Sequence, residues 1–208
     1  MTRWLLACLI GEAAGMAGVA LAYAALDRGL LEMSVWILAG GAWEGLCLGT
    51  SQAWVLGPRG VRRSGWIPMT VLAAVLGYSG SLAGSAAGGG EGSEPSVILI
   101  VGFGVTLGIV MGVLMGAFQW ISARTLIRAK SWLLANAIGW ALAMPVIMLA
   151  ASTAGADWRL EEVGLLGAAS GGLAGLLLGV STFRYQSNPK RRSDGALAAR
   201  HVWLTIPA

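Results

Sequence analysis

Charge, cysteine and histidine are scarce in this sequence. Only 12% of its 208 residues are charged, about half of the ~25% that soluble domains carry. The two cysteines, Cys8 and Cys47, lie in apolar segments, which excludes the disulfide framework of a small secreted protein. The single histidine, His201, lies in a polar C-terminal tail, so the chain cannot form a bis-histidine haem site or an intramembrane Ser–His pair. We therefore expect no enzymatic activity, no metal site and no cofactor.

Apolar residues and glycine make up most of the chain. Hydrophobic residues account for 56% of it and glycine for 32 residues, and the mean hydropathy is +0.72. Several apolar stretches exceed twenty residues, a length typical of membrane-spanning helices. This composition excludes a soluble enzyme and a nucleic-acid-binding domain, and the pI near 9.6 reflects loop charges.

Six apolar segments are each long enough to cross a hydrocarbon core of ~30 Å at 1.5 Å per residue. Only helices satisfy every backbone polar group within one segment in lipid. The sequence thus predicts an all-α membrane protein with a six-span domain over residues 1–183 and a basic cytoplasmic tail over residues 184–208. The predicted spans are Trp4–Leu26, Met33–Leu56, Trp66–Ala87, Ser96–Ala123, Trp132–Ser152 and Val163–Phe183.

Basic residues are divided unequally between the two sets of loops. With a cytoplasmic N-terminus, 12 of the 14 basic residues lie on the cytoplasmic side, and only Arg28 and Arg159 lie outside. The positive-inside rule then predicts that both termini are cytoplasmic. We expect a multi-pass protein of the bacterial cytoplasmic (inner) membrane.

A glycine pattern recurs at the end of every second span. Gly45-Leu-Cys-Leu-Gly49-Thr-Ser-Gln52 is matched 67 residues later by Gly112-Val-Leu-Met-Gly116-Ala-Phe-Gln119, and after a further 63 by Gly175-Leu-Leu-Leu-Gly179-Val-Ser-Thr182. Such a period indicates an internal repeat. Glycines four apart let helices approach closely, so we expect spans two, four and six to form the inner bundle and the other three to surround it. The predicted packing residues are Gly41, Gly45, Gly49, Gly104, Gly108, Gly112, Gly116, Gly167, Gly171, Gly175 and Gly179.

The alternate spans also begin alike. Trp4, Trp66 and Trp132 each follow basic residues. Together with the glycines they predict three tandem helical hairpins, at about residues 3–56, 62–123 and 130–183, related by a pseudo-threefold axis along the membrane normal. The same tryptophans, with Trp54 and Trp120, are interpreted as an aromatic belt at the cytoplasmic interface.

Each of the two spans of the first hairpin carries one acidic residue near the middle of the bilayer. Glu12 and Glu44 have no acidic counterpart in the other repeats. A carboxylate at mid-membrane costs ~2.5–3.5 kcal/mol on insertion scales and is a functional candidate. The pair could share a proton, bind a cation or meet a cationic solute; alternatively, one or both are neutral and bonded between helices.

Two further polar groups are candidate sites. Gln52, Gln119 and Thr182 occupy equivalent places and predict a polar layer, either a gate on the axis or interhelical hydrogen bonds. Trp43, Asn136 and Trp140 lie deep in their spans, where an indole N–H needs a partner. They could line a pocket with Glu44 or simply pack.

Two interpretations of function remain open. The glycine-rich helices that end in Gln119-Trp120, and similarly in Gln52-Ala-Trp54, resemble small uncharacterised multi-pass bacterial membrane proteins. That resemblance implies no activity. Sparse intramembrane polarity favours a non-catalytic accessory or scaffold subunit packed against other membrane subunits. The alternative is a small-solute transporter or ligand-binding component that uses Glu12 and Glu44. The expected further partners are the lipid bilayer and, at the basic tail, anionic lipids.

Overall fold

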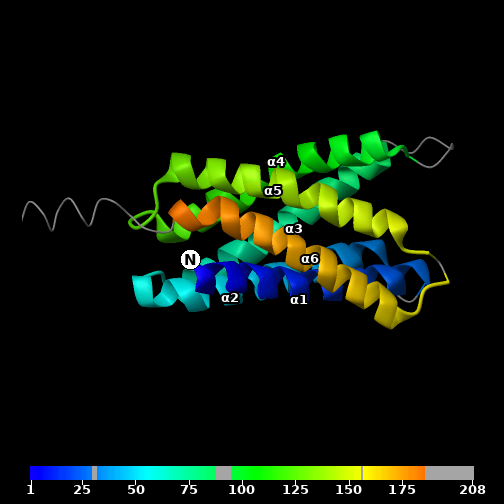
Figure 1. Ribbon diagram of the computed structural model, residues 1–208, viewed down its shortest axis with the longest axis horizontal. Helices are drawn as coiled ribbons and strands as arrows, with labels where there is room; N and C mark the ends of the chain where they lie inside the picture. Colours follow the sequence, from blue (N-terminus) through cyan, green and yellow to red (C-terminus); the bar gives the residue numbers. More distant parts are fainter. Residues whose placement is uncertain (30–31, 88–94, 156, 186–208) are drawn as a thin grey trace, which may run out of the picture.

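The computed structural model describes residues 1–29, 32–87, 95–155 and 157–185. These residues form six long helices and two short 3-10 turns, without a strand in the described ranges (Figure 1). The helices are α1 (Thr2–Asp27), α2 (Met33–Leu56), α3 (Arg63–Ala87), α4 (Val97–Ala123), α5 (Ala129–Thr153) and α6 (Leu160–Thr182), and the turns are η1 (Gly57–Arg59) and η2 (Phe183–Tyr185).

The protein has the helices of a membrane protein. Within the described residues, α1, α4, α5 and α6 are long and apolar enough to cross a membrane. Each predicted segment corresponds to one helix, although Ser96 and Phe183 lie one residue outside α4 and α6, and α2 has the predicted bounds. The basic tail lies outside the described residues from residue 186 onwards.

Local sequence signals explain where several helices begin and end. The Ser96 hydroxyl accepts a hydrogen bond from the Leu99 backbone N–H at 3.4 Å and so caps α4. At the start of α6, the Glu162 carboxylate accepts from the Arg159 backbone N–H at 2.7 Å. Gly60, with φ of +95°, turns the chain from η1 towards α3 in a conformation that L-residues with a side chain rarely adopt.

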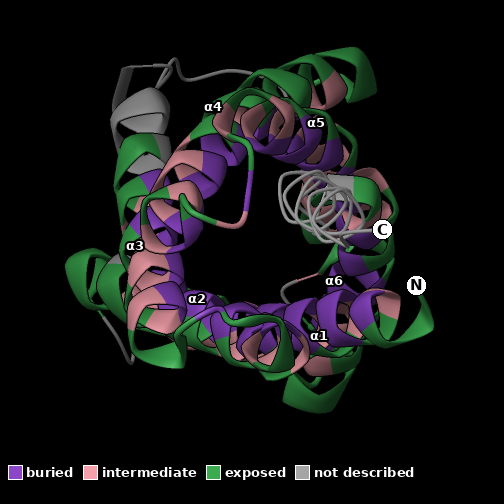
Figure 2. Ribbon diagram, turned by 90° about the vertical axis from the view of Figure 1, so that its left-hand side faces the viewer, coloured by how far each residue is buried: buried purple, intermediate pink, exposed green. Residues whose placement is uncertain are grey.

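The six helices form a closed ring in chain order. Each helix packs against its neighbours in sequence, and α6 packs against α1; the α1–α6 and α4–α5 interfaces are the most extensive. Figure 2, viewed along the helices, shows them arranged around a common axis, with the buried residues on the sides that face inward and towards neighbouring helices. All six helices therefore contribute both to the wall and to the interior.

This arrangement corrects the prediction of three inner and three outer helices. In the described part of the chain, α2, α4 and α6 have their substantial contacts with α1, α3 and α5, not with one another. The reason is the direction of the glycine faces. They are turned sideways, towards the helix that follows in the ring, so close approach occurs within the wall.

The glycines of α2, α4 and α6 meet the backbone of the next helix. A Cβ atom built on Gly45 would lie 2.6 Å from the Val71 Cα. One on Gly112 would lie 2.6 Å from the Ala137 Cα, and one on Gly175 would lie 2.7 Å from the Cys8 carbonyl carbon. Such distances leave no room for a side chain, so any larger residue must push two helices apart.

We predict that Gly112→Ala destabilises the ring. The added methyl group would overlap the Asn136 and Ala137 backbone, and overpacking typically costs ~1–3 kcal/mol. The thermal unfolding midpoint in detergent should fall by several degrees. Gly102→Ala, on the same helix but with nothing within 4 Å of the added atom, is the matched control and should leave the midpoint unchanged or slightly raised. Equal midpoints for the two variants would contradict the close packing of α4 on α5.

Candidate functional site

Three tryptophans meet inside one end of the ring. Trp4, Trp66 and Trp132 begin α1, α3 and α5 and are at most 1% exposed. The ring centroids of Trp4 and Trp132 are 6.3 Å apart, and those of Trp66 and Trp132 are 5.9 Å apart, both in edge-to-face geometry. The interpretation of these three as part of an aromatic belt at the cytoplasmic interface is therefore wrong, because their indoles are buried in the ring interior. Trp54, in contrast, is 72% exposed.

The predicted polar layer lies against this tryptophan cluster. Gln52, Gln119 and Thr182 are all buried. The Trp4 Nε1–H donates to the Thr182 Oγ1 at 3.0 Å, and the Trp66 Nε1–H donates to the Gln52 Oε1 at 3.2 Å. The Gln119 Nε2–H donates to the same Gln52 oxygen at 3.0 Å. The layer thus joins α1 to α6 and α2 to α3, and it joins α2 to α4 across the interior of the ring.

The two glutamines of the layer also bond to residues one helical turn beyond the tryptophans. Gln119 also donates to the Thr70 hydroxyl at 3.3 Å, and Gln52 donates to the Cys8 sulfur at 3.7 Å. Among the described residues, the Trp132 Nε1 and the Gln119 Oε1 are buried without a hydrogen-bond partner. Trp132 of α5 and Gln119 of α4 make up the third pair of a tryptophan with the layer residue of the helix before it in the ring, and this pair is not bonded. Trp66–Gln52 and Trp4–Thr182 are the two corresponding pairs, and both are bonded.

The two acidic residues lie deeper in the ring. Glu12 is 0% exposed and Glu44 is 2% exposed, and Glu44 packs against α1 one turn from Glu12. The Tyr78 hydroxyl donates to the Glu44 Oε2 at 2.5 Å. Both Glu12 oxygens, in contrast, have no hydrogen-bond partner among the described residues. A fully buried carboxyl group without a partner is rare and needs an explanation.

Backbone proximity between α1 and α2 brings this pair together. Gly15 lies one turn from Glu12, and a Cβ built on it would be 3.1 Å from the Glu44 Cα. Glycine at position 15 therefore lets α2 place Glu44 directly against α1.

Of the other predicted pocket residues, Trp43 and Asn136 form hydrogen bonds away from Glu44. Trp43 is 47% exposed, and its indole N–H donates to the Ala14 carbonyl at 3.0 Å on the outer side of α1. Asn136 is buried, but it donates back to the Trp132 carbonyl at 3.0 Å, nearer the tryptophan cluster. Trp140 is 1% exposed and its Nε1 has no partner in the described ranges. Its position, eight residues after Trp132, corresponds to that of Glu12 after Trp4.

Tyr78 is the functional candidate that the sequence did not reveal. It lies twelve residues after Trp66, as Met16 lies after Trp4. Counting inward from each tryptophan would have placed it on the interior side of α3. Its pairing with Glu44, however, depends on how α2 and α3 pack.

Comparison with known proteins gives no relative: no family model, curated protein or solved structure matches this chain. The resemblance to small bacterial membrane proteins therefore stays a prediction, as do the absence of enzymatic activity and the partners. The proposed function rests on the residues described above.

We predict that Gln52→Leu destabilises the tryptophan end of the ring more than Thr182→Val does. Loss of the Gln52 oxygen removes the acceptor of two buried donors, and an unpaired buried group costs ~1–3 kcal/mol. Thr182→Val removes the acceptor of Trp4 alone. The measurement is thermal unfolding in detergent followed by tryptophan fluorescence. Ser181→Ala is the control, because the Ser181 hydroxyl donates only to the Leu177 carbonyl of its own helix. Equal stability of Gln52→Leu and Ser181→Ala would contradict the bonded layer.

Proposed function

We propose that this protein is a small membrane transport component that holds an exchangeable proton between Glu12 and Glu44. The observation that carries the proposal is the full burial of Glu12 with both carboxyl oxygens unpaired among the described residues. Two ionised carboxylates at this depth would each lose their hydration and repel each other. One proton removes the repulsion and neutralises one of the two groups, and the Tyr78 hydroxyl donates to Glu44, which can remain charged.

A proton fits these surroundings better than a metal ion. Ca²⁺ needs six to eight oxygen ligands and Mg²⁺ needs an octahedral set. The described residues contain no group of three His, Cys, Asp or Glu residues suited to a metal. A proton requires only one carboxyl oxygen and a nearby second group that can accept it.

Tyr78 gives the two carboxyl groups different roles. Its hydroxyl donates to Glu44, and a hydrogen bond to the charged form of a carboxyl group favours that form. Glu44 is therefore the preferred carboxylate, and Glu12, which lacks a donor, is the preferred carboxylic acid. Glu12 is not hydrogen-bonded to Glu44 in this structure, so transfer of its proton to the Glu44 carboxylate requires a side-chain rotation that brings the two groups into contact. The transfer then exchanges the two forms without a change in total charge.

The competing function is the non-catalytic accessory or scaffold subunit. Sparse intramembrane polarity favours it in the sequence, and so do the glycine ladders, which could receive helices of a partner. In the structure, Gly45, Gly112 and Gly175 are each packed against the next helix of the same chain. These three faces are therefore occupied. The geometry gives more support to a function that resides inside the ring.

We also propose that the ring consists of three tandem hairpins related by a pseudo-threefold axis. Gly45, Gly112 and Gly175 lie against the fourth residue after the tryptophan of the next odd-numbered helix, namely Thr70, Asn136 and Cys8. The contacts within hairpins also correspond. Gly11 lies against Leu48 and Ser51, and Gly139 lies against Leu178 and Ser181. Leu48 and Ser51 are related to Leu178 and Ser181 by the offset that relates Gly45 to Gly175, and Gly11 is related to Gly139 by the offset that relates Trp4 to Trp132.

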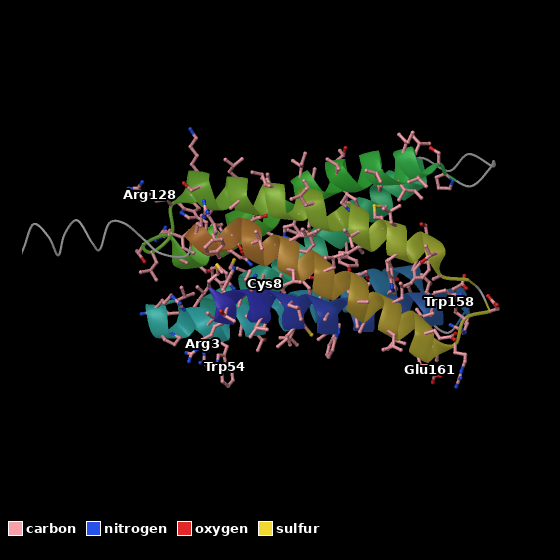
Figure 3. All side chains as sticks on the ribbon, viewed as in Figure 1. Arg3, Cys8, Trp54, Arg128, Trp158 and Glu161 are labelled. Carbon is pink, nitrogen blue, oxygen red and sulfur yellow. The ribbon has the colours of Figure 1, made fainter. Side chains whose placement is uncertain are left out.

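The distribution of charge supports the proposed orientation. Arg3 and Arg128 lie at one end of the helices, and Glu161 lies at the other (Figure 3). If the basic end is cytoplasmic, the N-terminus is inside and the tryptophan cluster lies on the cytoplasmic side. We accordingly assign the protein to a bacterial cytoplasmic membrane, with both termini cytoplasmic.

We predict that infrared difference spectroscopy detects a buried protonated carboxyl group. Purified protein at neutral pH should show a carboxylic C=O band that shifts in D₂O, because its proton exchanges. Glu12→Gln should abolish this band, and Glu44→Gln should move or abolish it. Glu32→Gln, at an exposed position, is the control and should leave it unchanged.

A flux measurement separates transport from the accessory function. In proteoliposomes with a pH gradient, the transport proposal predicts a proton flux above that of empty vesicles, lost in Glu12→Gln. If the carboxyl band is present but no proton flux is measured, the protein holds a buried proton without transporting it. That result would overturn the proposed transport. Absence of the band would overturn the shared proton itself.

A further inference from the structure

An outward-facing groove runs between α1 and α2. Its volume is about 1190 Å³. It is lined by small residues of α1, including Ala7, Gly11 and Ala14, and by larger residues of α2, including Leu46 and Trp54. The groove is separate from the Glu12–Glu44 pair, which is buried inside the ring.

The two ends of the groove differ in chemistry. Arg3 and Arg59 line one end, and both are exposed. In the described part of the chain, neither guanidinium forms a salt bridge with a carboxylate. Arg63 lies near the same end, with its Cζ 5.8 Å from the centroid of the Trp54 ring. Trp43 lines the other end, where its indole is hydrogen-bonded to the Ala14 carbonyl.

The length of the groove corresponds to one leaflet of a bilayer. From Arg3 to Ala14, helix α1 rises by about 16 Å. This is about half of the ~30 Å hydrocarbon thickness. A molecule with an anionic group at the arginines and an apolar chain along the helices would therefore end near the bilayer midplane.

We propose that this groove binds one anionic phospholipid of the leaflet at the basic end. Its phosphate lies between Arg3 and Arg59, and an acyl chain lies along Leu6, Ile10 and Leu46. Charge complementarity argues for the anionic headgroup, since two cationic side chains without carboxylate partners line the mouth. The comparable hollow between α3 and α4 is smaller, about 200 Å³, and has no charged residue in its lining. It therefore lacks the features for headgroup recognition.

The test is native mass spectrometry of the full-length protein in detergent, with phosphatidylglycerol or phosphatidylcholine of identical acyl chains added. We expect one phosphatidylglycerol to be retained, with a preference of at least about tenfold over phosphatidylcholine. Arg3→Gln combined with Arg59→Gln should remove the preference. Arg124→Gln combined with Arg128→Gln is the matched control, because both residues are exposed and absent from the lining of the groove.

A blocking variant tests the position of the acyl chain. Thr50 is exposed and lines the groove, so Thr50→Trp should fill it and reduce retention of both lipids while the unfolding midpoint is maintained. Equal retention of the two lipids by the wild type would overturn the proposal. An equal loss in the Arg124 and Arg128 control would also overturn it, since attraction would then come from the basic end as a whole. Unchanged retention in Thr50→Trp would overturn the assigned groove.

Discussion

Close approach between glycines and a neighbouring backbone is the constraint on which this structure depends. Lipid tails are as apolar as leucine, so burial of apolar side chains does not by itself drive helices together in a membrane. Packing at short range must supply the attraction instead. Gly45 of α2, Gly112 of α4 and Gly175 of α6 each remove a side chain at the point where the next helix passes. Because the last of these contacts joins α6 to α1, the same interaction closes the ring.

Closure of the ring brings together two groups of buried polar residues, one at the tryptophan end and one deeper inside. At one end, three indoles meet and the buried glutamines and Thr182 accept or donate hydrogen bonds beside them. Deeper inside, α1 and α2 approach closely at Gly15, which holds Glu44 beside the helix that carries Glu12. The bonded layer fixes the tryptophan end, whereas Glu12 has no described partner. Within the described layer, Gln119 Oε1 and the adjacent Trp132 Nε1 are unpaired but both glutamines and Thr182 are bonded, whereas neither oxygen of Glu12 has a bond. This difference supports a function at the acids.

Much of this arrangement could be predicted from sequence, because helix length and buried polarity leave direct signals. The bounds of α2 match the prediction, and Glu12, Glu44, Gln52, Gln119, Thr182 and Asn136 are all buried. Which face of an apolar helix points inward was harder to predict, since lipid and protein interior are both apolar. Trp4, Trp66 and Trp132 at a basic helix end fit either environment, and Trp43 beside Glu44 proved to face outward. The Tyr78–Glu44 bond depends on the packing of α3 on α2, which sequence spacing alone does not determine.

Disulfide formation between α1 and α6 tests ring closure most directly. A Cβ built on Gly179 lies 3.4 Å from the Cys8 Cβ, close to the ~3.5–4.5 Å of natural disulfides. In a Cys47→Ser background, Gly179→Cys should therefore oxidise rapidly with Cys8, and the two halves of the chain should remain linked after proteolysis at a site inserted between α3 and α4. Gly102→Cys, in open surroundings on α4, should give no link. Separation of the halves in both variants would show that the first and last helices are not neighbours, which would contradict the ring.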